Sequence, residues 1–136
     1  MEKKTLIYVF VLLISKLFSG SIIQSIKTGN WRDSSTWKNN ILPSSTDSIL
    51  ISFGDTIFIN ASNAEAKYIK NEGVIFFKSA SNSLRCIETS FFNGEVTGSS
   101  LGILNTETIS FSGKCILGKC NLEVSKSTHI KDSLEI

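Results

Sequence analysis

The feature that most constrains the fold is a series of short β-forming runs, rich in Ile, Val, Phe and Thr and separated by Asn, Gly and Ser. Helical periodicity is almost absent, and proline occurs once. The runs predict strands over residues 48–53, 56–60, 66–70, 74–78, 84–88, 94–97, 101–104, 108–111, 114–117, 121–125 and 129–131. The fold class is therefore all-β.

Two all-β architectures fit this pattern. An antiparallel β-sandwich would join its strands by hairpins and use Asn93-Gly94 as a tight turn. A parallel solenoid would use very short strands, whose apolar side chains stack on their equivalents one coil later. The runs are about four to five residues long. Their inward pairs are expected to be Ile57 with Ile59, Tyr68 with the nearby Ile69, Val74 with Phe76, Leu84 with Cys86, Ile109 with Phe111 and Leu122 with Val124. We expect a short right-handed parallel β-helix, with the antiparallel sandwich as the alternative.

The segment before the first regular strand has an unusual order of residues. It reads Thr-Gly-Asn-Trp-Arg-Asp-Ser-Ser-Thr-Trp over 28–37, and Pro43, Asp47 and the run Gly-Asp-Thr-Ile over 54–57 follow. Large aromatic rings at this position can lie over an open solenoid core and seal it. We therefore expect Trp31, Trp37, Pro43 and Asp47 to form a structural cap, with Pro43 ending the ladder and the Asp47 carboxylate accepting backbone N–H bonds in a turn.

This order of residues resembles the opening segment of secreted bacterial parallel β-helix proteins, written G-x-W-x-D-x-x-T-W, then P-x-x-x-D-x-V-x-I, then G-x-T-V. It is also similar to the eight-glycine β-helix domain of some animal extracellular receptors and hyaluronan-processing proteins. The resemblance covers about thirty residues and implies a β-helix fold and an extracellular location.

The N-terminus has the features of a signal peptide. Lys3 and Lys4 precede an apolar run over residues 6–18, and Ser19-Gly20-Ser21 supplies small residues for cleavage before Ile22. The run is shorter than the roughly 20 residues that span a bilayer. We expect a signal peptide over 1–21, a cap segment over 22–47 and solenoid coils over 48–136, with no integral membrane segment after cleavage and a secreted or cell-surface location.

Charge argues against nucleic acid as a partner. The chain carries a formal net charge of +2, but residues 1–21 contain Lys3, Lys4 and Lys16 against Glu2 alone, so the remainder is balanced. No basic stripe is present in the sequence. The expected partner is an extracellular glycan or a surface protein.

Three cysteines, Cys86, Cys115 and Cys120, make an odd count for an oxidising compartment. Cys115 and Cys120 are close enough in sequence to form a bridge, but the chain lacks the cysteine density of a disulfide scaffold. Small core residues are the favoured interpretation. No Cys-x-x-Cys or His-rich motif accompanies them, so neither a metal site nor another cofactor is expected.

Catalytic chemistry has weak support in the sequence. His129 is the single histidine, and only Asp132 lies near it. Glycan hydrolysis needs two carboxylates facing each other across a groove, and the candidates Glu88, Glu95, Glu107 and Glu123 are dispersed. The β-helix fold alone does not imply the lyase or hydrolase activity that some β-helix enzymes have. We expect no enzyme activity and no catalytic residues.

Aromatic residues are the best candidates for ligand binding. Neighbours in a strand point to opposite faces, so one ring of Phe76-Phe77 and one of Phe91-Phe92 is expected to face outward. The predicted ligand-binding residues are Trp31, Trp37, Phe77 and Phe92. The alternative is that these rings are buried in the core.

The C-terminus stops where another coil would begin, at coil lengths of about 20 to 25 residues. The coils are thus expected to be incomplete there, and self-association through the C-terminal coil is expected. The sequence predicts an exported non-catalytic β-solenoid module that serves adhesion or glycan recognition. The alternative is an N-terminal fragment of a larger carbohydrate-active β-helix enzyme.

Overall fold

The computed structural model describes residues 20–112, 114–130 and 133–135, with the backbone alone over 114–117, 129–130 and 133–135. Its strands are β1 (Ile22–Gln24), β2 (Gly29–Asn30), β3 (Ser48–Ile51), β4 (Thr56–Ile59), β5 (Ala64–Asn71), β6 (Val74–Phe77), β7 (Ser83–Phe92), β8 (Glu95–Gly98), β9 (Gly102–Phe111), β10 (Lys114–Leu117), β11 (Cys120–Ile130) and β12 (Ser133–Glu135). Two 3-10 helices, η1 (Ser34–Thr36) and η2 (Lys38–Asn40), complete the elements. Most of the signal peptide expected over 1–21 lies outside the described residues.

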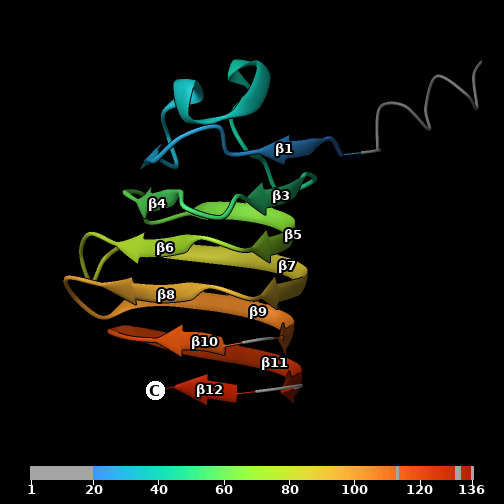
Figure 1. Cartoon of the computed structure of the whole chain (residues 1–136), viewed down its shortest axis with the longest axis vertical. Coiled ribbons are helices and arrows are strands. Elements are labelled where there is room, and N and C mark those ends of the chain that lie inside the picture. Colours follow the sequence, from blue (N-terminus) through green and yellow to red (C-terminus); the bar gives the residue numbers. More distant parts are fainter. Residues whose placement is uncertain (1–19, 113, 131–132, 136) are drawn as a thin grey trace, which may run out of the picture.

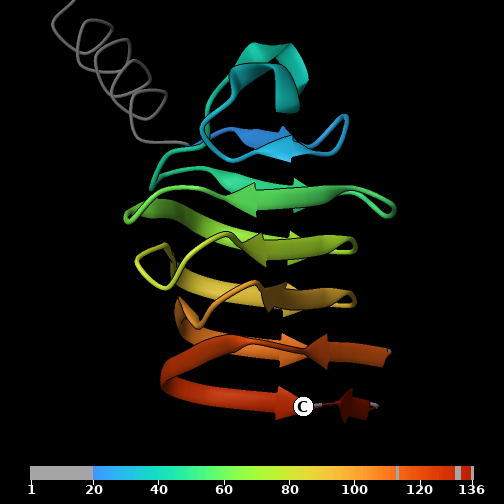
Figure 2. The same cartoon turned by 90° about the vertical axis from the view of Figure 1, so that its left-hand side faces the viewer.

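The strands form a parallel β-solenoid. The odd-numbered strands make one six-stranded sheet in the order β1-β3-β5-β7-β9-β11, and the even-numbered strands make a second in the order β12-β10-β8-β6-β4-β2. Figure 1 shows each coil lying directly beneath the one before it, and Figure 2 shows the same stack from the side. Every pair of named strands in the described chain is parallel. The parallel β-helix prediction is confirmed, and the antiparallel sandwich is wrong.

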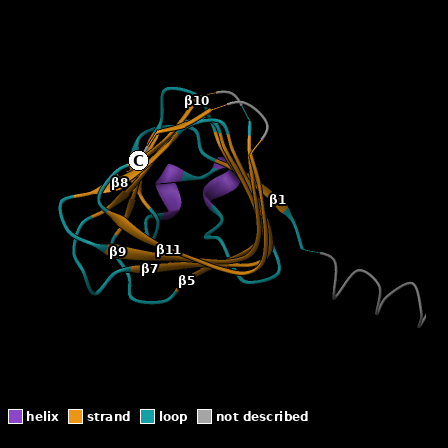
Figure 3. Cartoon of the chain, turned by 90° about the horizontal axis from the view of Figure 1, so that it is seen from below, coloured by secondary structure: helices purple, strands orange, loops and turns teal. Residues whose placement is uncertain are grey.

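Long strands bend around one corner of the coil. The register shifts between Ala66 and Tyr68 where β5 pairs with β7, and again between Cys86 and Thr89 where β7 pairs with β9. An extra residue of this kind bends a strand and increases its twist. Seen along the solenoid axis, the coils have a three-sided outline (Figure 3).

Inward side chains stack in columns along the axis. Ile57, Ile75 and Val96 face one another through the ladders of β4, β6 and β8, and all three are fully buried. Such columns form the core because each coil covers the apolar face of the next. In β6, however, Ile75 and Phe77 point inward, so the expected inward pair of Val74 with Phe76 is wrong by one residue. In β5, Ile69 is buried as expected, but Tyr68 faces outward.

The N-terminal end of the core is closed by η1, η2 and two tryptophans. Trp31 and Trp37 are buried, and their rings meet edge to face with centroids 5.3 Å apart. Figure 1 shows the helices beyond the first coil, and Figure 3 shows them inside the three-sided outline. The aromatic cap is therefore confirmed. The cap segment also contributes β1 and β2, which pair with β3 and β4 and were not predicted.

Asp47 accepts hydrogen bonds from the turn before β3 and from the residue that precedes β1. Its Oδ1 accepts the Ser21 N–H at 2.8 Å, and its Oδ2 accepts the Ser44 N–H at 2.9 Å. The predicted role for this carboxylate is confirmed. Pro43 precedes the turn that Asp47 closes and belongs to neither strand that flanks it.

The last described coil is open on its outer side. Leu84, Leu104 and Leu122 stack in register, yet Leu84 and Leu104 are fully buried whereas Leu122 is only partly buried. Cys120 and Val124 of the same coil are also only partly buried. The inward side chains of β11 therefore lack the cover that each earlier coil receives.

Candidate functional site

The four aromatic residues predicted to bind a ligand are all buried. Trp31 and Trp37 are in the cap, and Phe77 and Phe92 are in the core. An exposed sugar-stacking role for these four residues is wrong, because no face of any ring is accessible. Phe76 and Phe91 are the outward members of the two Phe pairs, and Phe91 is half exposed.

Outward side chains instead border a shallow apolar hollow on the sheet of odd-numbered strands. We call it the sheet hollow; it has a volume of about 210 Å³ and is lined mainly by Ile22, Leu50, Tyr68, Lys70 and Phe91. Leu50, Lys70 and Phe91 stand side by side on three successive coils. The parallel register thus places an aliphatic group, a cation and an aromatic ring in one outward column.

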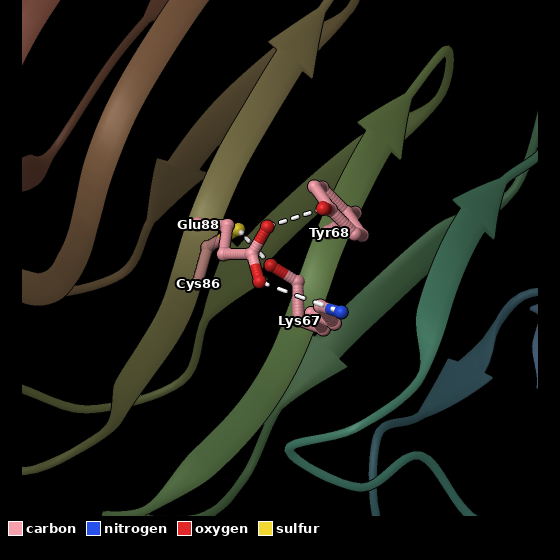
Figure 4. A network of polar contacts seen from close by, with 4 residues as sticks. All are labelled: Lys67, Tyr68, Cys86 and Glu88. Carbon is pink, nitrogen blue, oxygen red and sulfur yellow. Dashed lines mark hydrogen bonds and ion pairs between the residues drawn. The ribbon is translucent and has the colours of Figure 1, made fainter. Parts of the chain in front are cut away.

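The Tyr68 ring in this hollow is held by a polar network at the bend (Figure 4). The Tyr68 hydroxyl donates to Glu88 Oε2, and Lys67 Nζ lies 3.4 Å from Glu88 Oε1. Lys67 Nζ also lies 5.3 Å from the centroid of the Tyr68 ring. The hydrogen bond from Tyr68 lowers the pKa of Glu88, and the same bond raises the pKa of Tyr68.

Cys86 belongs to the same bend but faces inward. Its Sγ lies 3.3 Å from the Lys67 carbonyl oxygen and 3.2 Å from that of Thr89. Burial raises the pKa of its thiol, and a neutral buried thiol is a poor nucleophile. Cys86 and Cys120 are both free thiols. The predicted core role is confirmed for Cys86, which is buried, whereas Cys120 is only partly buried. The side chain of Cys115 lies outside the described residues.

A second hollow lies at the corner between β3 and β4 and continues along the turns of the next two coils. This turn hollow has a volume of about 280 Å³ and is lined by Phe53, Gly54, Glu72, Gly73, Val74, Asn93, Gly94 and Glu95. Phe53 is 90% exposed, the highest value among the large hydrophobic residues described as exposed. The site therefore combines an aromatic ring with carboxylate and amide groups.

Glycine is required in these turns because the coils approach closely. A Cβ atom on Gly94 would lie 2.2 Å from the Gly73 carbonyl oxygen, and one on Gly73 would lie 2.4 Å from that of Asp55. The Asn93-Gly94 pair thus serves a close approach between coils rather than the hairpin that a sandwich would need. The glycines leave the floor of the turn hollow free of side chains.

The two hollows adjoin each other. Lys70 lines the sheet hollow and Glu72 the turn hollow, and Lys70 Nζ lies 2.6 Å from Glu72 Oε1. This ion pair therefore joins the lining of the turn hollow, which includes Phe53, to that of the sheet hollow, which includes Tyr68 and Phe91. Sequence analysis did not select these rings; the signal for Phe53 was an apolar residue directly before Gly54 in a turn.

The carboxylates considered for catalysis do not face each other across a groove. Glu88 and Glu107 lie near the same corner on neighbouring coils, but Glu88 pairs with Lys67 and Glu107 pairs with Lys126. Glu123 accepts a hydrogen bond from Asn105. Among the described residues, no group of His, Cys, Asp and Glu is arranged to hold a metal ion. The side chain of His129, like Asp132, lies outside the described residues.

No family model, curated protein or solved structure matches this chain. The resemblance of the opening segment to secreted β-helix proteins therefore remains a prediction. In the described part of the chain, no helix has the length and apolar character needed to cross a membrane.

Proposed function

We propose that the protein is an exported, non-catalytic β-solenoid module that recognises glycans outside the cell or at its surface and so serves adhesion. The observation that carries this proposal is the adjoining pair of hollows bordered by Phe53, Tyr68 and Phe91. Sugar rings have apolar faces that stack on aromatic side chains, and their hydroxyl groups bond to carboxylates and amides. A hollow that combines apolar walls with a few polar groups suits such a ligand.

The rigidity of the surface supports the same function. Tyr68 is fixed by Glu88 and Lys67, and each coil is held to its neighbours by ladder hydrogen bonds. A ligand that binds prearranged side chains loses little free energy to their ordering. An extended glycan would therefore meet its stacking platforms already in place.

The proposal is tested by calorimetric titration of the purified protein with neutral and charged oligosaccharides. Phe53→Ala and Phe91→Ala should each weaken binding about tenfold or more, since stacking on an aromatic ring contributes a large share of such affinity. Leu101→Ala is the matched control, because Leu101 is exposed and lines neither hollow. Unchanged affinity in both Phe variants would reject the surface as a glycan site.

A further inference from the structure

The two carboxylates that line the turn hollow differ in whether they have a cationic partner. Glu72 is neutralised by Lys70 at 2.6 Å. Glu95 also lines the hollow, yet its carboxylate has no ion pair with any side chain that the structure describes. Among the side chains that the structure describes, Glu95 is therefore the charged group of the hollow that has no ion-pair partner.

The backbone of Glu95 is held firmly in this position. Its N–H donates to the Gly73 carbonyl oxygen at 2.9 Å, and its own carbonyl oxygen accepts Asn71 Nδ2 at 3.0 Å. The residue is partly buried. A carboxylate that has lost part of its water and has no cationic partner favours a cation supplied by a ligand.

Phe53 supplies a second feature that favours a cation. Its ring is 90% exposed at the other end of the hollow. The face of an aromatic ring attracts ammonium groups, and it also covers the apolar face of a sugar. An anionic sugar would face Glu95 and would be repelled by like charge.

We propose that the turn hollow selects sugars that carry a free amino group, as in a polymer of glucosamine units, with Phe53 under the sugar ring and Glu95 accepting a charge-assisted hydrogen bond from the ammonium. This inference rests on the proposed glycan-binding function and narrows it to one ligand class. It concerns the turn hollow alone, because no carboxylate lines the sheet hollow.

The test compares three oligosaccharides of equal length by calorimetric titration: β-1,4-linked glucosamine, its fully N-acetylated form and the corresponding glucose oligomer. The amino form should bind the intact protein about tenfold or more tightly than either of the others, because hydrogen bonds to charged groups are the stronger class. Added salt should reduce this preference. A lysine-containing oligopeptide serves as a fourth probe, since it offers the ammonium group without the sugar.

Glu95→Gln keeps the shape of the side chain and removes its charge, so the variant should bind the amino, N-acetylated and glucose forms with similar affinity. Glu65→Gln is the matched control, because Glu65 lines neither hollow and lies 3.9 Å from Arg85. Equal affinity for the amino and N-acetylated forms would overturn the inference and leave glycan binding standing. Peptide binding as tight as amino-sugar binding would also overturn it, and failure to bind any sugar would reject both proposals.

Discussion

Trp37 Nε1 donates a hydrogen bond of 3.0 Å to the carbonyl oxygen of Trp31, so the two rings of the cap are joined by a polar contact as well as by packing. The indole N–H of a buried tryptophan needs such a partner. In this cap the partner is the backbone of the other tryptophan. The indole N–H of Trp37 therefore has its hydrogen-bond partner within the cap.

Replacing Trp37 by Ala should destabilise the fold by about 3 to 5 kcal/mol, since it removes a fully buried ring and leaves a cavity over the core. Chemical denaturation monitored by circular dichroism measures the loss. Ile26→Ala, at an exposed position in the same segment, should change stability by less than about 0.5 kcal/mol. A loss below about 1 kcal/mol for Trp37→Ala would contradict the sealing role.

Asn71→Ala should destabilise the protein by about 1 to 3 kcal/mol, because it leaves buried backbone groups without their partners. The Asn71 side chain is fully buried, donates to the Glu95 carbonyl oxygen and accepts the Gly73 N–H at 3.2 Å. Thermal unfolding measures this effect. Asn105→Ala removes an exposed amide and is the control. Equal stability of Asn71→Ala and Asn105→Ala would show that the Asn71 side chain does not hold the turn in place.

The stabilising effect of the Tyr68–Glu88 contact should depend on pH at both extremes. The pKa of Glu88 is below its ordinary value of 4.5, so its contribution is present above that value and is lost as pH falls through the lowered folded pKa. The pKa of Tyr68 is above its ordinary value of 10.0, so its contribution is present below 10.0 and is lost as pH rises through the raised folded pKa.

Tyr68→Phe isolates this effect, with Lys67 and the buried Cys86 left in place around Glu88. The difference in unfolding free energy between wild type and variant should be constant through neutral pH and shrink toward acid and toward alkali. Denaturant unfolding across the pH range measures it. A difference that does not vary with pH would mean that the hydroxyl and the carboxylate do not interact in solution.

The protein of this sequence should self-associate at high concentration, because the partly buried Cys120, Leu122 and Val124 offer apolar surface beside an open edge. Leu122→Lys should reduce the association seen by sedimentation, whereas Asn121→Lys, at an exposed position of the same strand, should not. A monomeric wild type that unfolds cooperatively at every concentration would mean that β11 and the residues after it already form an adequate edge.

Export should produce a new N-terminus near Ile22. The basic, apolar and small-residue regions of 1–21 together carry this prediction. N-terminal sequencing of protein recovered outside the cytoplasm of an exporting host tests it. Recovery of the chain in the cytoplasm with Met1 intact would contradict it.

The architecture and the cap could be predicted from the sequence, but the outward residues of the proposed ligand surface could not. The cap was predictable because few arrangements bury two tryptophans beside a single proline. The outward faces were not, since Val-Ile-Phe-Phe in β6 is apolar on both faces and gives no period-two signal that separates Phe76 from Phe77. The bend adds one residue to β7 relative to its neighbours β5 and β9, and no local pattern reveals this shift.

The close contact between Gly73 and Gly94 also keeps the coils at a fixed spacing along the turn hollow. Phe53 and Asn93 lie at equivalent turns two coils apart, and stacked strands are separated by about 4.8 Å, so the turn hollow spans about 10 Å. This length is fixed by how many coils the hollow crosses rather than by any side chain. On the proposed function, the length of ligand that fits the turn hollow would change only in whole steps, by the gain or loss of a coil.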